Sequence, residues 1–146
     1  KNYFDDEFRR FTSNHRSAIN SVAIALLDQE DLDRAAELMK YSLKVMPHEA
    51  IPYDLASGQM VPLLFEVGED DLALDIVDKI SHKSIQMLDF YDRTGRSYDR
   101  EALISLEMLK YFVPLLSERG YKEVSDKLRK ELERHLGPSV NEMIFE

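Results

Sequence analysis

A short phrase that occurs twice constrains this chain more than any other feature. Residues 61–68 are Val-Pro-Leu-Leu-Phe-Glu-Val-Gly and residues 113–120 are Val-Pro-Leu-Leu-Ser-Glu-Arg-Gly, so six of the eight positions are identical. The two copies start 52 residues apart. Self-similarity at such a distance is typical of arrays that repeat one supersecondary unit. These arrays usually present a binding surface and seldom contain a reaction centre.

The composition excludes several classes of protein. The chain has 146 residues, of which 44% are hydrophobic and 10% aromatic, and this excludes general disorder although 32% are charged. The net charge of −9 argues against binding to nucleic acid or to an anionic membrane surface. The absence of cysteine excludes disulfide bonds and zinc–thiolate sites. No apolar run approaches the roughly 20 residues that span a bilayer.

Apolar spacing and helix breakers predict an all-α chain. Between the breakers the apolar residues follow the i, i+3, i+4, i+7 spacing of amphipathic helices, and no stretch alternates as a strand does. The breakers are Pro47 with Pro52, Gly68, residues 92–97, Gly120, and Gly137 with Pro138. We therefore expect six main helices in three hairpins: 14–28 with 31–46, 53–67 with 70–91, and 99–119 with 121–136.

Aligning the hairpin turns predicts the type of repeat. With Glu30, Gly68 and Gly120 taken as equivalent, a small residue follows five positions later each time, at Ala35, Ala73 and Ser125. Pro47 ends the first unit. This layout is that of a tetratricopeptide unit, although the turn spacings of 38 and 52 depart from its period of about 34 residues. We expect a tetratricopeptide-like right-handed superhelix of about three hairpins. The single helical-repeat domain would comprise a leading arm 1–13, repeats 14–47, 51–91 and 99–137, and a tail 138–146.

Two prolines are expected to lie inside helices. If Pro62 and Pro114 opened their helices, only about six residues would precede each turn glycine. Longer helices that bend at the proline are favoured, although an internal proline costs about 3 kcal/mol in an isolated helix. The carbonyl groups that lose their donors would be those of Gly58 and Lys110.

Catalytic signatures are missing from the sequence. It contains no nucleophile elbow, no Gly-rich phosphate loop, no His-Glu-x-x-His and no calcium-loop spacing, so we predict no catalytic, cofactor-binding or metal-binding residues. Asp75, Asp78 and His82 share one helical face and are the best alternative, a metal-dependent enzyme that uses the acidic 66–78 region. A solvated charged face explains these residues as well.

The first helices of the hairpins are the expected binding surface, because they line the concave face of tetratricopeptide arrays. Polar, aromatic and aliphatic groups together suit an extended peptide or a neighbouring domain. The alternative is a groove filled by the N-terminal aromatic arm (Phe4, Phe8, Phe11) or by the tail (Val140, Met143, Ile144, Phe145). The candidate residues for binding a partner are Asn20, Ile24, Leu27, Gln59, Phe65, Lys110 and Tyr111, together with Pro62 and Pro114.

Several short motifs resemble one protein family. The motifs are Asn14-His15-Arg16, Ala25-Leu26-Leu27, Leu32-x-x-Ala35, Val45-Met46-Pro47, and Ile51-Pro52-Tyr53-Asp54 leading to Gly68. They resemble the C-terminal tetratricopeptide-like region of bacterial multi-spanning membrane proteins of unknown function, whose membrane part is similar to protein O-mannosyltransferase-type glycosyltransferases. The resemblance covers roughly residues 10–136.

The resemblance implies a function and a location. The chain would be a non-catalytic protein-interaction or scaffold domain, the extracytoplasmic (periplasmic) C-terminal part of a longer membrane protein. The start Lys1-Asn2-Tyr3, with neither methionine nor signal peptide, also favours a piece of a longer chain. Its partner would be a protein or peptide, such as the membrane portion of its parent chain or an acceptor polypeptide, with no cofactor. The alternative is a cytoplasmic tetratricopeptide adaptor that binds a peptide.

Overall fold

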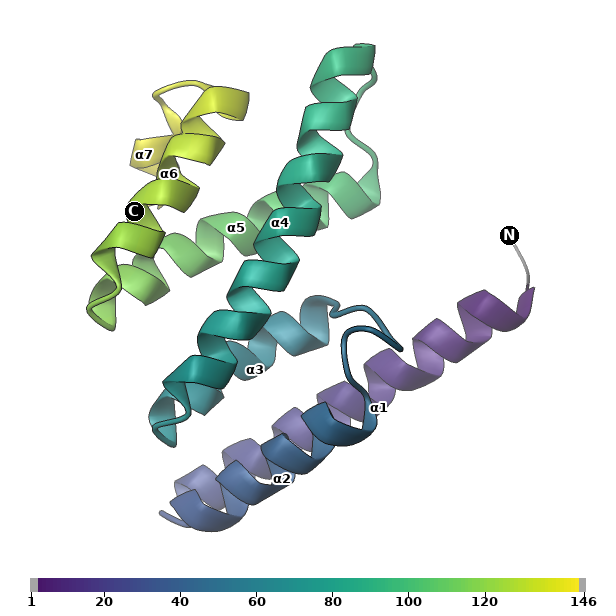
Figure 1. Ribbon diagram of the computed structural model, residues 1–146, viewed down its shortest axis with the longest axis vertical. Coiled ribbons are helices and arrows are strands. Elements are labelled where there is room, and N and C mark those ends of the chain that lie inside the picture. Colours follow the sequence, from purple (N-terminus) through teal and green to yellow (C-terminus); the bar gives the residue numbers. More distant parts are fainter. Residues whose placement is uncertain (1–2, 145–146) are drawn as a thin grey trace. The chain divides into compact units, whose positions relative to one another are not determined.

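The chain forms helices joined by short loops. The computed structural model describes residues 3–144, with side chains from residue 6 onward. Within residues 3–144 no strand occurs, so the all-α prediction is confirmed. The helices are α1 (Tyr3–Asp28), α2 (Leu32–Val45), α3 (Leu55–Glu66), α4 (Asp70–Thr94), α5 (Arg100–Glu118), α6 (Lys122–Leu136) and α7 (Val140–Ile144) (Figure 1).

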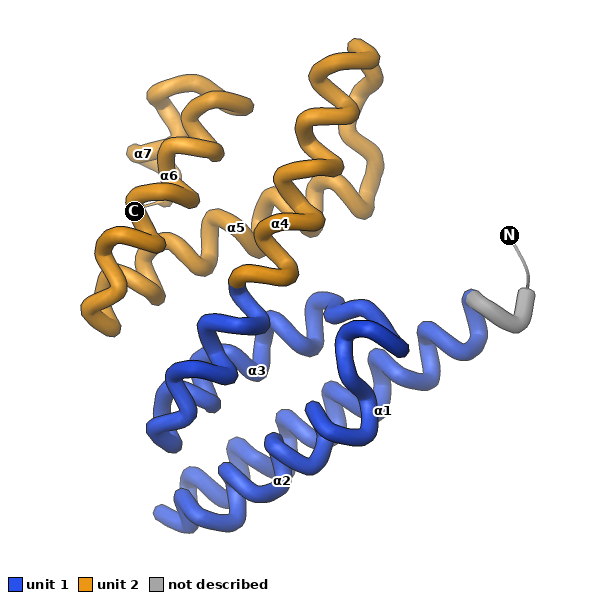
Figure 2. Tube along the Cα trace, viewed as in Figure 1, with its two compact units in different colours: residues 1–77 blue, residues 78–146 orange. Residues whose placement is uncertain are grey.

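The helices belong to two compact units, coloured separately in Figure 2. Unit 1 comprises Lys1–Val77 and unit 2 comprises Asp78–Glu146, so the boundary falls within α4. In unit 1, α1 packs against α2 and α3, and α2 also contacts α3. In unit 2, α5 packs against α6, and the short α7 contacts both of them. Helices adjacent in sequence thus pair with each other.

The three hairpin turns share one backbone geometry. Glu30, Gly68 and Gly120 all have positive φ, at 59°, 79° and 91°. At each turn the following N–H donates to the carbonyl five residues earlier, as in Asp31 to Leu26 and Tyr121 to Leu116, both at 2.9 Å. This is the Schellman pattern, which satisfies carbonyls that a helix end would otherwise leave unpaired. The turn alignment made from the sequence is confirmed.

The small residues predicted five positions after each turn are buried. Ala35 and Ala73 are 0% exposed and Ser125 is 3% exposed. The hydroxyl of Ser125 donates to the carbonyl oxygen of Val113 at 2.6 Å, which joins α6 directly to the backbone of α5. A larger side chain at this position would force the two helices apart.

The turn geometry predicts that exchanging glycine and a larger residue changes stability in opposite directions at two of the turns. Glu30 carries a Cβ in the left-handed region, so Glu30→Gly should stabilise the chain by about 0.5–1 kcal/mol. Gly120→Ala should cost about 1 kcal/mol through the backbone alone, because an added Cβ meets no atom within 4 Å. Urea denaturation of both variants measures these changes. Glu37→Gly, the control within α2, should destabilise by about 1 kcal/mol, and a stabilising result there would contradict the argument.

Two further expectations concern helix interiors and ends. Pro62 lies inside α3 and Pro114 inside α5, as predicted. Helix α2 ends at Val45, just before Pro47, because proline lacks the N–H that would continue the helix. At the start of α3, Asp54 and Ser57 form a reciprocal capping box, which satisfies N–H groups that the first turn leaves without partners.

The ends of the chain differ from the prediction. Residues 3–13 are not a separate arm, because α1 is one continuous helix from Tyr3 to Asp28. Phe8 and Phe11 are 57% and 67% exposed, so these two rings do not fill a groove. In the predicted tail, Val140 and Ile144 are buried within unit 2, whereas Met143 is exposed. The side chain of Phe4 and all of Phe145 lie outside the described residues.

Candidate functional site

In unit 1 the predicted binding residues divide into buried and exposed groups. Asn20 is 6% exposed, and its side-chain amide donates to the carbonyl oxygen of Ala56 at 2.8 Å, which links α1 to α3. Phe65 is 4% exposed and belongs to the core. Ile24 and Gln59 are exposed, and Leu27 is half-buried. Of these five residues, Ile24 and Gln59 are therefore the two that are exposed to a partner.

In unit 2 the two candidate residues lie at the surface of α5. Tyr111 is 48% exposed, and its partial burial raises the pKa of its hydroxyl. The Nζ atom of Lys110 lies 2.9 Å from Oε1 of Glu107, one turn earlier on the same helix. An exposed aromatic ring beside an ion pair is compatible with contact to a peptide. That these residues and those of unit 1 form one binding face stays a prediction.

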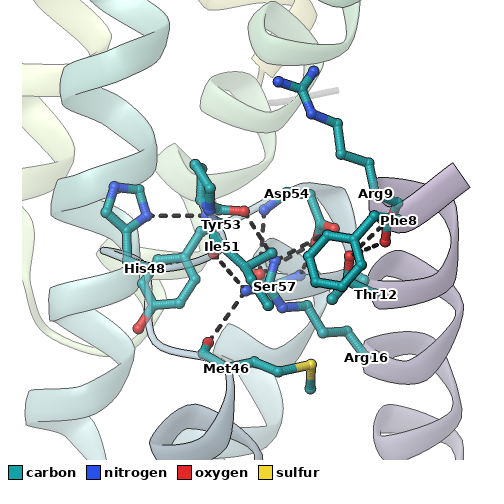
Figure 3. A network of polar contacts seen from close by, with 12 residues as sticks. Phe8, Arg9, Thr12, Arg16, Met46, His48, Ile51, Tyr53, Asp54 and Ser57 are labelled. Carbon is teal, nitrogen blue, oxygen red and sulfur yellow. Dashed lines mark hydrogen bonds and ion pairs between the residues drawn. The ribbon is translucent and has the colours of Figure 1, made fainter. Parts of the chain in front are cut away.

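The most elaborate polar network is in unit 1 and centres on Arg16, shown in Figure 3. The Arg16 side chain is 3% exposed. Its guanidinium donates to the carbonyl oxygens of Ile51 at 2.7 Å, Pro52 at 2.9 Å and Met46 at 3.2 Å. It also lies 3.4 Å from the carboxylate of Asp54. The planar fork of arginine suits this task, because it places several donors in fixed directions.

Aromatic residues of the same loop complete the network. The guanidinium of Arg16 lies 5.6 Å from the ring centre of Tyr53. The backbone N–H of Tyr53 donates to Nδ1 of His48 at 2.9 Å, and the two rings lie 4.8 Å apart (Figure 3). Arg16 therefore fastens the whole α2–α3 loop, residues 46–54, onto α1. The role of this network is structural.

This network joins two of the motifs that carry the family resemblance. Asn14-His15-Arg16 lies on α1, and Ile51-Pro52-Tyr53-Asp54 forms the end of the loop and the cap of α3. They are 35 residues apart in sequence but meet through the hydrogen bond from Arg16 to Ile51. The residues of these two motifs therefore attach the α2–α3 loop to α1.

A second cluster, in unit 2, was not anticipated from the sequence. The side chain of His135 on α6 is 0% exposed. Its Nδ1 contacts the carboxylate of Asp92, and its Nε2 lies 3.2 Å from the carboxylate of Asp89, without the alignment of a hydrogen bond. Arg134 donates to Asp89 at 2.8 Å, and the hydroxyl of Tyr98 donates to Asp92 at 2.9 Å. The cluster ties α6 to the second half of α4.

The surroundings of Asp92 and Tyr98 favour an ionised Asp92 carboxyl group and a neutral Tyr98 hydroxyl group. Partial burial acts to raise the pKa of Asp92, but hydrogen bonds from His135 and Tyr98 outweigh it, so the pKa falls below its usual value. Burial, the hydrogen bond to Asp92 and its charge raise the pKa of Tyr98 to about 12. At neutral pH a carboxylate therefore faces a protonated phenol. With its imidazole enclosed, His135 acts as a tie between helices.

The alternative metal site receives no support from the described residues. Asp75, Asp78 and His82 are exposed on α4, and His82 contacts the side chain of Gln86 at 3.2 Å. Among the side chains that the structure describes, from residue 6 to residue 144, no group of three acidic, histidine or cysteine residues is placed to hold a metal ion. Glu69, in the same acidic region, forms an ion pair with Lys40 at 2.6 Å.

Comparisons with known proteins are negative. Family profiles, curated proteins and solved structures all give no match to this chain. In the part of the chain that the structure describes, none of the helices combines the length and apolar character needed to cross a membrane.

Proposed function

We propose that this chain is a non-catalytic protein-interaction module that binds an extended peptide or a neighbouring domain. The three hairpins would stack as a tetratricopeptide-like right-handed superhelix. The binding residues would be Ile24, Gln59 and Tyr111, which are exposed, together with the half-buried Lys110.

The observation that carries this proposal is a contrast between two groups of side chains. Buried polar residues hold the fold together, whereas large apolar residues remain exposed at the surface. Buried polar residues such as Arg16, Asn20 and Ser125 bind backbone carbonyls and hold helices and loops together. Large apolar and aromatic side chains stay exposed on both helices of the hairpins, and on the first helices they include Ile24 on α1 and Tyr111 on α5. Aromatic residues are enriched at protein interfaces, so this surface suits a protein partner.

The family resemblance supports a more specific context. In this context the chain would be the extracytoplasmic C-terminal part of a membrane glycosyltransferase-like protein. The transferase chemistry would belong to the membrane portion of that protein. The gene sequence upstream of Lys1 tests this context. Many apolar helices encoded there would support it, whereas their absence would favour the cytoplasmic peptide-binding adaptor.

Peptide selection tests the interaction function itself. Linear peptides selected from a random library on the whole chain should bind wild type and lose affinity at least about ten-fold with Tyr111→Ala, because aromatic anchors dominate interface energies. The measurement is fluorescence anisotropy of labelled peptides. Tyr41→Ala is the matched control, since Tyr41 is 61% exposed on the second helix α2. Peptides that bind both variants equally well would contradict the proposed face.

A further inference from the structure

Helix α1 buries several polar side chains and exposes several apolar ones. The residues that it buries within unit 1 include Thr12, Arg16 and Asn20, all 3–6% exposed. On another face of the same helix, Phe8, Phe11 and Val22 are 57%, 67% and 51% exposed. A surface helix normally buries its apolar stripe. This stripe lies open although apolar exposure is costly.

The exposed stripe has the spacing of a coiled-coil seam. The spacing between successive members of the stripe alternates between three and four residues along α1, and all of them are exposed. Such a seam covers one side of a helix and matches a second helix packed alongside it. The stripe, which we call the α1 seam, consists of Phe8, Phe11, His15, Ala18, Val22 and Ala25.

We propose that the α1 seam binds the α1 seam of a second copy of this chain, with the two helices antiparallel. In this register Phe8 faces Ala25, Phe11 faces Val22, and His15 faces Ala18 of the other copy. Each large side chain meets a smaller one, so the surface is complementary to itself, as a two-fold interface requires. A parallel pair would instead set Phe8 against Phe8 and Phe11 against Phe11.

The area of the seam sets the expected strength. An aromatic side chain has roughly 150–250 Å² to bury, and Phe8 and Phe11 are 57% and 67% exposed. Together with the smaller seam residues, two copies would therefore remove at most about 1,000 Å² from solvent, near the lower limit for specific interfaces. We therefore expect a reversible dimer with a dissociation constant on the order of 10–100 µM. This surface is distinct from Tyr111 on α5, so its test is independent of the peptide-binding proposal.

Analytical ultracentrifugation of the whole chain tests the dimer. Wild type should dimerise in the range given above, and Phe11→Ser should weaken association at least about ten-fold. Leu103→Ser, at a residue 50% exposed on α5, should leave it unchanged. Circular dichroism confirms folding of each variant, which we expect because Phe11 is largely exposed. A wild-type chain that stays monomeric up to about 1 mM, or equal weakening by both variants, would overturn the proposal.

Cross-linking tests the orientation of the two helices, helped by the absence of native cysteine. Phe8 and Ala25 are 17 residues apart on one helix, roughly 26 Å, so only the antiparallel register brings them together between copies. Mixed under mild oxidation, Phe8→Cys and Ala25→Cys chains should form a disulfide with each other. Exclusive disulfides between two Phe8→Cys chains would overturn the antiparallel arrangement.

Discussion

Replacing Arg16 by alanine should destabilise unit 1 by about 3 kcal/mol or more, as measured by urea denaturation. The change removes the donors that reach Met46, Ile51 and Pro52 and leaves Asp54 without its ion-pair partner. Buried carbonyls without donors cost about 1–3 kcal/mol each, although relaxation of the loop recovers part of this. Since a domain is stable by only 5–15 kcal/mol, about 3 kcal/mol is a large fraction.

Two further variants separate the network from general effects on α1. Arg10→Ala is the matched control on the same helix, because the Arg10 side chain is 72% exposed and should contribute less than about 0.5 kcal/mol. Arg16→Lys keeps the charge but loses the planar fork, so we expect an intermediate loss. Equal stability of Arg16→Ala and Arg10→Ala would show that the loop is not held as described.

The features predicted correctly from the sequence are the local ones. The turns at Glu30, Gly68 and Gly120 depend on backbone conformations within a few residues, and glycine and small residues at fixed offsets mark them. The interior positions of Pro62 and Pro114 followed from counting residues to the next glycine. Helix periodicity likewise needs only neighbouring residues.

The features missed depend on contacts between distant segments. The residues next to Arg16 in the sequence do not indicate that its side chain binds a loop 30 or more residues away. The available signal was its spacing with Thr12 and Asn20, four residues on either side, which places three polar residues on one helical face. His135 and Asp92 are 43 residues apart, and periodicity does not encode such a pairing.

The candidate binding face was predictable only in part. Alignment by turns correctly assigns which helix a residue belongs to, but burial depends on what the neighbouring segment covers. Asn20 is buried because α3 supplies the carbonyl of Ala56, and Phe65 because unit 1 packs around it. Tyr111 and Gln59 remain exposed.

Replacing His135 by alanine should be the most damaging change in the polar cluster of unit 2, at about 2–4 kcal/mol. The imidazole is 0% exposed, so its removal leaves a cavity and two carboxylates, Asp89 and Asp92, without the group between them. Urea denaturation measures the loss. His82→Ala is the matched control, because His82 is exposed on α4 and should change stability by less than about 0.5 kcal/mol.

Acid should narrow the difference between wild type and His135→Ala. The pKa of Asp92 is lowered in the folded chain, so its contribution to stability is present above its unfolded pKa and disappears as pH falls through the lower folded value. We therefore expect the full difference at neutral pH and a smaller one as the pH falls below about 4, where the Asp92 carboxyl of the unfolded chain takes up a proton before that of the folded chain does. A difference that does not change with pH would mean that His135 acts by filling space and that its contact with the Asp92 carboxylate adds nothing, since the loss of packing does not titrate.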